Sequence, residues 1–371
     1  MKTKEFKFIF IPGTVFFVLS FISFILGSIY DFEIEEFLSK GFHFFSIKIW
    51  IIFFDVFGNF QFFPVLFIFL AILIETFFLF IKIKRKKEYY LILFLFYFLF
   101  LILWSYFCFT FVNNLYKKDE GFGINNDALL LLPMKYRINI SIIVIFFTTL
   151  IILLSAYYIR FKFSKRKDIF IQEYWIDSIK GILFIFLCYF MILIFKPLFG
   201  RPYYYSVIFN DILNSYLPEN WNYDSSKYFW GAGIDGTENV QYKNWWEIND
   251  FWKNLKYWFS STAHLNQTNG WINQDFPSGH TISSFCVISI MFLFINNKKN
   301  RKLTNKKISI IWIWFSLILF NMKFSLVIAM THWWTDVEFS TLFGLLMFFI
   351  VPKIIDYKQK RYFIKVNKKY N

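Results

Sequence analysis

Two histidines occupy polar stretches that adjoin long apolar runs. His280 closes the stretch Pro277-Ser278-Gly279-His280, which leads into an apolar segment at 282–295, and His332 precedes Asp336 by four residues. A proline in a first helical turn, a capping serine and a glycine make a helix start in which Ser278 and Gly279 can bind phosphate. A carboxylate four residues from a histidine shares its helical face and can orient the imidazole. Together these patterns predict a phosphate site with two catalytic histidines.

Each residue has a role in such a site. Once Asp336 orients it, the imidazole of His332 is a nucleophile toward phosphorus, while His280 can protonate the leaving oxygen and then activate water. Lys196 and Arg201, at the end of another apolar run, offer positive charge to phosphoryl oxygens. Taken singly, a histidine or lysine at the end of a span has an ordinary structural explanation. Their convergence on one face favours a site.

The elements that must position these residues are membrane spans. The 371 residues are 57% hydrophobic and 25% aromatic, and apolar runs of about 20 residues, the length that crosses a bilayer, recur along the chain. The net charge of +15 comes from Lys and Arg clusters between these runs, which is typical of cytoplasmic loops and argues against nucleic-acid binding. The three cysteines lie inside apolar runs, so neither a disulfide framework nor a thiolate metal site is indicated. Heavy use of Phe, Ile, Lys and Asn is typical of an AT-rich genome and favours a bacterial source.

We expect an all-α membrane protein, a polytopic helical bundle of about eight spans with a large external loop. The apolar runs are 8–30, 62–81, 89–112, 138–159, 179–199, 281–295, 308–326 and 337–350.

Charge sets the orientation of these spans. Most of the 40 Lys and Arg residues lie at the N-terminus, in segments 82–87, 160–180 and 298–307, and in the tail from Lys353. This distribution places both termini in the cytoplasm and the site on the extracytoplasmic face. Residues 42–57 are apolar but contain Lys48 and Asp55, and a span there would move 82–87 outside. We therefore expect an interfacial or partly buried helix at 42–57.

The external loop, residues 203–275, is rich in tryptophan. Amphipathic aromatic side chains at this height suit a membrane interface or a lid over the site, and equally a packed cap that does not touch substrate. The tryptophans are Trp221, Trp230, Trp245, Trp246, Trp252, Trp258 and Trp271.

These residues and spacings resemble the type 2 phosphatidic acid phosphatase superfamily, the membrane lipid phosphate phosphatases that also resemble glucose-6-phosphatase and the vanadium haloperoxidases. The second motif of that family, Pro-Ser-Gly-His, is complete at 277–280, and Ser325, His332 and Asp336 match the third. The resemblance covers roughly the region from Lys196 to Gly344. It implies that the substrate is a lipid phosphate in the bilayer.

Two departures from the family pattern concern the cations. Leu326 stands where the third motif has an arginine, and the nearest cation is Lys323, which becomes a further candidate phosphate ligand. In the first motif Arg201 follows Lys196 by five residues instead of seven, which on a helix turns it through about 140°. Either cation can set the register. We expect both to serve in the site, because a break in the helix between them removes the need for strict periodicity.

The sequence therefore predicts a metal-independent phosphoric monoester or pyrophosphate hydrolase, without a cofactor, that acts through a phosphohistidine on His332. Residues 1–178 would hold N-terminal transmembrane helices, 179–352 a phosphatase core with the loop 203–275, and 353–371 a basic cytoplasmic tail. One alternative is a catalytically degenerate member that binds lipid phosphate or a partner without turnover, motivated by Leu326. A transporter is a weaker alternative, because the ionisable residues gather at one face and not at mid-membrane. The oligomeric state is not determined by the sequence.

Overall fold

The computed structural model describes residues 4–82, 86–117, 135–216, 231–232, 237–249, 251–252, 255, 274–295 and 303–370. Within these ranges every regular element is a helix, apart from one isolated bridge between Ala232 and Glu238. The all-α fold class predicted from the sequence is confirmed.

The helices of the described chain begin at Lys4 and end at Tyr370. They are α1 (Lys4–Ser39), η1 (Lys40–His43), α2 (Phe45–Phe60), α3 (Phe63–Lys82), α4 (Lys86–Lys117), α6 (Lys135–Phe161), η2 (Phe163–Lys165), α7 (Tyr174–Phe199), α8 (Tyr204–Val207), α9 (Phe209–Tyr216), α11 (Gly279–Ile288), α12 (Met291–Phe294), α13 (Asn305–Ile328) and α14 (Trp334–Tyr370).

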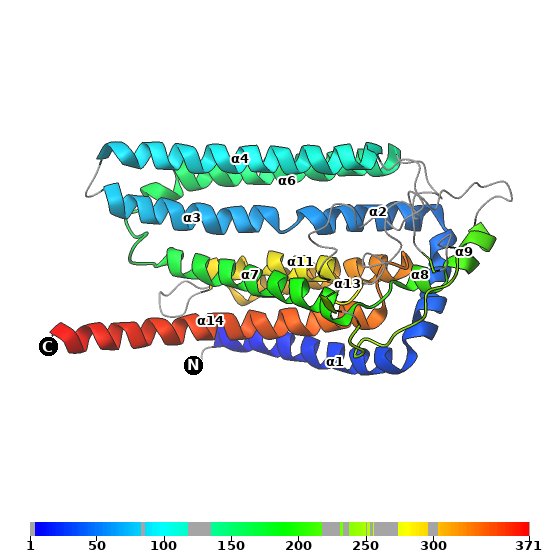
Figure 1. Cartoon of the computed structure of the whole chain (residues 1–371). Coiled ribbons are helices and arrows are strands. Elements are labelled where there is room, and N and C mark those ends of the chain that lie inside the picture. Colours follow the sequence, from blue (N-terminus) through cyan, green and yellow to red (C-terminus); the bar gives the residue numbers. More distant parts are fainter. Residues whose placement is uncertain are drawn as a thin grey trace.

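The eight predicted apolar runs all correspond to helices. Seven segments of the described chain are long and apolar enough to cross a membrane, and α11 with α12 forms a shorter apolar segment, Gly279–Phe294. The C-terminal end of α3, the N-terminal end of α4 and the connection from α6 to α7 lie at the same end of the bundle as both termini (Figure 1). The turns from α1 to α2 and from α13 to α14 lie at the opposite end. At its C-terminal end α14 continues as one helix through most of the predicted tail.

Helix α2 is part of the bundle. It lies in line with α3, with a turn at Gln61 and Phe62, and the two form one candidate span, Phe45–Ile81. Its side chains pack against α6, α13 and α11. Of the two placements that the sequence allows for 42–57, the structure therefore has a partly buried helix and not one lying in the interface. Asp55, which argued against a span, forms an ion pair with Arg137 of α6 inside the bundle.

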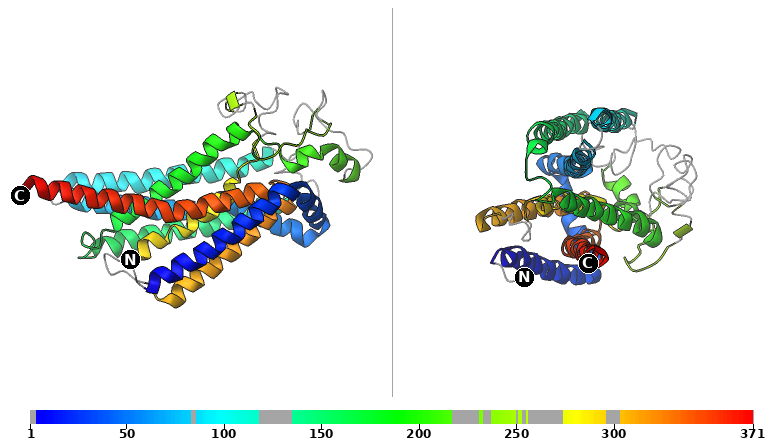
Figure 2. Two further views of the ribbon diagram at one scale, coloured as in Figure 1. Left: turned by 90° about the horizontal axis from the view of Figure 1, so that it is seen from below. Right: turned by 90° about the vertical axis from the view of Figure 1, so that its left-hand side faces the viewer.

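The short helix α11 lies at the centre of the bundle, surrounded by α2, α7, α13 and α14. Viewed along the bundle, α4 and α6 lie on one side and α1 with α14 on the other (Figure 2). Phe285 of α11 is fully buried, and its ring packs on Gly344 of α14. A Cβ on Gly344 would lie only 2.4 Å from the nearest atom of that ring. The glycine therefore lets α14 approach α11 closely, which brings together the ends of the two helices that carry the predicted site.

Candidate active site

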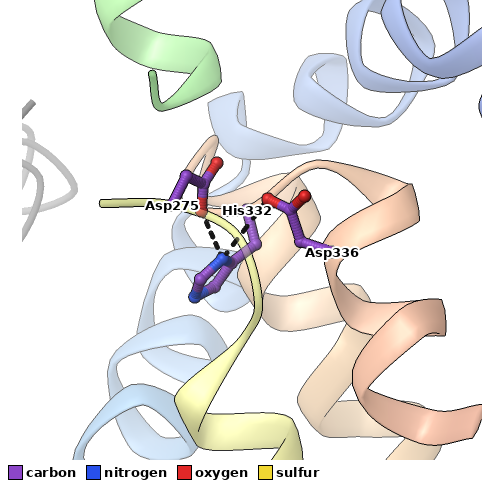
Figure 3. Close-up of side chains that lie close together, drawn as sticks. All are labelled: Asp275, His332 and Asp336. Atoms are coloured by element: carbon purple, nitrogen blue, oxygen red, sulfur yellow. Dashed lines mark ion pairs between the residues drawn. The ribbon is translucent and has the colours of Figure 1, made fainter. Parts of the chain in front are cut away.

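His332 lies in the turn between α13 and α14, and two carboxylates meet its ring. Its Nδ1 atom contacts Oδ1 of Asp275 and lies 3.7 Å from Oδ2 of Asp336 (Figure 3). His332 is 5% exposed and both aspartates are fully buried. The sequence predicts the pair of His332 with Asp336, and the structure brings the two together although His332 precedes the first residue of α14.

Asp336 is fixed by the start of its own helix. It is the third residue of α14, and its Oδ2 accepts a hydrogen bond from the backbone N–H of Trp333 at 3.2 Å. An acidic residue in the first turn that reaches back to the N-cap satisfies a donor that the helix leaves unpaired. Part of what holds the carboxylate in place is therefore local to the start of α14.

Asp275 is a site residue that was not predicted from the sequence. It lies at the end of the external loop, two residues before Pro277, and that position beside the phosphate motif was the available signal. Its backbone N–H donates to the carbonyl of Arg201 at 3.1 Å, and Lys196 Nζ donates to its carbonyl at 3.2 Å and to that of Gln274. The end of α7 thus holds the segment that carries Asp275.

Burial sets the ionisation of this group. Desolvation lowers the pKa of His332 to about 4, so its imidazole is neutral at pH 7. Desolvation, with the negative charge of Asp336 as a second cause, raises the pKa of Asp275 well above its usual range. Asp336 then carries the charge of the carboxyl pair, since Arg201 Nη1 donates to its Oδ1 at 2.7 Å. With carboxyl groups at Nδ1, the lone pair of His332 is left on Nε2.

His280 lies in the first turn of α11, against α2. Asn59 Nδ2 is 3.1 Å from its Nε2, and Asp55 Oδ1 is 3.5 Å from the same nitrogen. Gly58 makes room for the ring, because a Cβ there would lie 2.1 Å from Cδ2 of His280. These three residues of α2 were not assigned to the site from the sequence. Asp55, an acid within an apolar run, was the available signal.

The start of α11 is open. Ser278 is its N-cap, and the serine hydroxyl accepts hydrogen bonds from the backbone N–H and the hydroxyl of Thr281, at 3.4 and 3.0 Å. Pro277 precedes the cap, so it does not occupy the first helical turn as expected. A Cβ on Gly279 would meet no atom of the described chain within 4 Å. Free N–H groups and open space at a helix start can receive an anion.

Arg201 is fully enclosed by protein groups. It follows Gly200, which ends α7 with a φ of 49°, and its guanidinium is 2.7 Å from both Asp31 and Asp336 and lies over the ring of Trp333. Asp31 directly follows a kink in α1 at Tyr30 and was not predicted from the sequence. In this structure the arginine joins α1 to the start of α14.

The structure does not bring Lys323 to the histidines. Its Nζ lies 2.5 Å from Glu338 and 5.4 Å from the centre of the Trp334 ring. Leu326, at the arginine position of the third motif, packs in an apolar cluster with Met322, Val327 and Val337. Among the predicted cations it is Lys196 that lies near both histidines, close enough for its charge to act on them.

One group in the described chain has the composition of a metal site. Asp275, His332 and Asp336 each offer a ligand atom, and these atoms lie within 4.8 Å of one another. Both oxygens of Asp336 already accept hydrogen bonds, from Arg201 and from the backbone of Trp333. The cationic guanidinium beside that carboxylate opposes a second cation, so the group fits a histidine paired with two carboxyl groups better than a metal centre.

Part of the external loop packs against the site. Trp245 stacks on Phe276, with ring centres 6.0 Å apart, and its indole N–H donates to Ser28 of α1 at 2.9 Å. Trp246 and Trp252 are exposed. The other four predicted tryptophans, Trp221, Trp230, Trp258 and Trp271, lie outside the described residues. Trp245 thus packs between α1 and the residue that precedes Pro277.

Comparison with known families decides what kind of protein carries this arrangement. Residues 177–360 match the family model described as the PAP2 superfamily. The chain belongs to the PAP2 superfamily. It is also 29% identical over 376 residues to an uncharacterized protein of Mycoplasma capricolum subsp. capricolum, with 94% of each chain covered. No solved structure matched the chain.

PAP2 membership confirms the resemblance seen in the motifs and supports a membrane phosphatase type of protein. The matched segment contains both histidines, Lys196 and the two aspartates at His332. Other residues that contact the site precede it, on helices outside the family match. They are Asp31, Asp55, Gly58, Asn59 and Arg137.

Proposed function

We propose that this PAP2 protein is an integral-membrane phosphatase that hydrolyses a lipid phosphate or pyrophosphate at the extracytoplasmic face. The reaction proceeds through a phosphohistidine on His332. The observation that carries the proposal is the buried His332, whose Nδ1 lies against Asp275 and Asp336 while Nε2 is left for substrate; His280, at the start of α11, is the separate acid and base. This is the arrangement of an oriented nucleophile with a separate acid and base.

In the first step Nε2 of His332 attacks phosphorus, and the bond from phosphorus to the leaving oxygen breaks. His280, which enters this step in its protonated form with Asp55 as counter-ion, gives a proton to that oxygen, so the leaving lipid departs as an alcohol, or as a phosphate if the substrate is a pyrophosphate. Lys196 and the N–H groups at the start of α11 stabilise the charge on the phosphoryl oxygens. Asp336 stabilises the positive charge that develops on the imidazole.

In the second step water attacks the phosphohistidine. His280, now neutral, takes a proton from the water as the new P–O bond forms and the P–N bond breaks. Inorganic phosphate leaves, and His332 returns to its neutral state.

The position of the site supports a lipid substrate. It lies at the end of the bundle opposite both termini and the junctions of α3 with α4 and α6 with α7 (Figure 1). The basic clusters at the N-terminus, at 82–87, at 160–180 and in the tail belong to the termini and these junctions, so the positive-inside rule supports a site on the outer face. A lipid whose chains remain in the bilayer can place its phosphate head group at that height.

The experiment is an assay of purified protein on phosphatidic acid and on an isoprenyl pyrophosphate, each with EDTA present. We expect phosphate release that His332→Ala abolishes, and an acid-labile, base-stable phosphoenzyme in rapid-quench samples. Asn321→Leu, which removes the acceptor for Trp50 away from the histidines, is the matched control. Absence of turnover in the wild type contradicts the activity. Turnover that survives His332→Ala contradicts the mechanism, and a requirement for added metal contradicts metal independence.

A degenerate member that binds lipid phosphate without turnover is the second candidate. Two observations favour it: Arg201 is bound by two carboxylates, and Leu326 packs in an apolar cluster. Loss of one charge-assisted ligand costs about 3 kcal/mol of transition-state stabilisation, which slows catalysis without necessarily abolishing it. Binding to phosphatidic acid vesicles with no phosphate release, at neutral and at acidic pH, would favour this candidate.

A further inference from the structure

His280, which acts as acid and then as base in the proposed reaction, contacts helices that precede the matched PAP2 segment. We propose that Asn59 and Asp55 of α2 are positioning residues for His280: Asn59 fixes the proton of the neutral ring on Nδ1, and Asp55, held by Arg137 of α6, accepts a hydrogen bond from the protonated ring. The catalytic meaning of this assignment rests on the proposed function, whereas the position of the proton does not.

One face of α2 carries the residues concerned. Gly58 and Asn59 follow Asp55 by three and four residues, which places both of them next to Asp55 on the helix surface. The absence of a side chain at Gly58 lets the imidazole lie against the helix backbone, where Asn59 and Asp55 both face its Nε2. Gln61, just beyond the helix, donates to the hydroxyl of Ser284 at 3.0 Å and so fixes α2 against α11.

The orientation of the Asn59 amide follows from its second contact. Its Nδ2 donates to the backbone carbonyl of Asp55 at 2.9 Å, and a carbonyl oxygen can only accept. The group that faces His280 Nε2 at 3.1 Å is therefore the same NH₂. Nε2 must accept that hydrogen bond, and in a neutral imidazole the proton is then on Nδ1.

The charged form of the ring has a different partner. When both nitrogens carry protons, Nε2 becomes a donor and can no longer accept from Asn59. Asp55 Oδ1, at 3.5 Å, is the acceptor within reach, and its other oxygen is bound by Arg137. Each protonation state of His280 thus has its own partner on α2, and the proton that the ring loses and regains between the two states is the one on Nε2.

Other charges also act on His280 and contribute to any effect of pH on it. Asp55 and Arg137 act from α2 and α6, Lys196 acts from α7, and His332 acts from the turn before α14. Asp55 is the anion among these four. Its loss is expected to disfavour the protonated ring and to move the alkaline limb of the activity profile to lower pH by about one unit.

The test of the tautomer uses NMR of protein labelled with ¹⁵N at its four histidines, with His280→Gln to assign the signal. In the wild type, above the pH at which His280 titrates, we expect the proton on Nδ1. Asn59→Asp, which can only accept, should move the proton to Nε2, and Asn59→Leu should give a mixture. A wild-type His280 with its proton on Nε2, or a proton position that neither variant changes, overturns the assignment.

The catalytic part is tested on phosphatidic acid vesicles with the same variants and Asp55→Asn. We expect kcat to fall about 10-fold or more with KM little changed, partial rescue by Asp55→Glu, and no change in the Asn321→Leu control. If the wild type is inactive, the proposed function fails while the NMR result still decides the tautomer. If the wild type is active and the pH profile of Asp55→Asn matches it, the role of Asp55 is wrong.

Discussion

The carboxyl group of Asp275 contacts Nδ1 of His332, the nitrogen that also faces Asp336. The two aspartates come from different segments of the chain, one from the last residues of the external loop and the other from the first turn of α14. The family motif supplies only Asp336. A second carboxyl at the same nitrogen ties the packing of the external loop to the orientation of His332.

Replacing Asp275 tests that coupling. Asp275→Asn keeps the shape of the side chain but offers an N–H or a neutral carbonyl to His332, so the ring is less firmly oriented. We expect kcat on phosphatidic acid to fall by about 10²-fold, with the fold intact by circular dichroism. Glu247→Gln, in the same loop and away from His332, is the control. Unchanged kcat in Asp275→Asn would show that Asp336 alone orients the nucleophile.

The pH dependence follows from the lowered pKa of His332. The nucleophile must be neutral, and a pKa of about 4 keeps it neutral well below the usual histidine range. The acid limb of kcat/KM, corrected for ionisation of the substrate phosphate, should therefore have its midpoint below pH 6.5. As the pH falls toward 4 the nucleophile gains a proton and activity is lost. A midpoint at or above 6.5 would contradict the desolvated environment of the ring.

Much of this fold could be predicted from the sequence, because each span is a long apolar run and the bilayer length is fixed. The sequence left the placement of α2 open between two alternatives. Lys48 and Asp55 argued against a span, but Asp55 pairs with Arg137, a residue in a different helix. Sequence patterns within one run do not show such partners, since burial of a charge depends on tertiary contacts.

The candidate site was predictable where it depends on local motifs and not where it depends on distant pairs. His280, His332 and Asp336 carry their spacing in the sequence, and the structure brings their helix ends together. Lys323 lies near the motif in sequence, but its partner Glu338 comes from the next helix. Its pairing therefore follows from how α13 packs on α14, which spacing does not encode.

Gly58→Ala should displace the ring of His280. A Cβ at Gly58 would lie 2.1 Å from that ring, so the imidazole or α2 must move. Gly181→Ala is the matched control, because its Cβ would lie 2.2 Å from the Phe69 ring in another part of the bundle. We expect both variants to lose about 1–3 kcal/mol of stability, but only Gly58→Ala to lose kcat, by about 10-fold or more. Equal kcat in the two variants would show that the packing of α2 against His280 does not affect catalysis.

Lys196 and Lys323 should differ in what they contribute. Lys196 acts on both histidines, so Lys196→Met should lower kcat/KM by about 10²–10³-fold. Lys323→Met leaves Glu338 buried without its cation, and we expect lower thermal stability with KM unchanged. Kinetics and melting of both variants in the same detergent check this. A raised KM in Lys323→Met, with stability unaffected, would restore Lys323 as a phosphate ligand.

Arg201 is expected to act mainly as a structural tie, because Asp31 and Asp336 lie 2.7 Å from its guanidinium and it is fully buried. Arg201→Met leaves two buried carboxylates uncompensated and should cost about 3–5 kcal/mol. Asp31→Asn relieves one of them, so the double variant should be more stable than the sum of the single changes predicts. The measurement is a double-mutant cycle of denaturant unfolding, with phosphatase kinetics on each variant. Additive stabilities, together with a large rise in KM for Arg201→Met alone, would show instead that the guanidinium leaves Asp31 to bind the substrate phosphate.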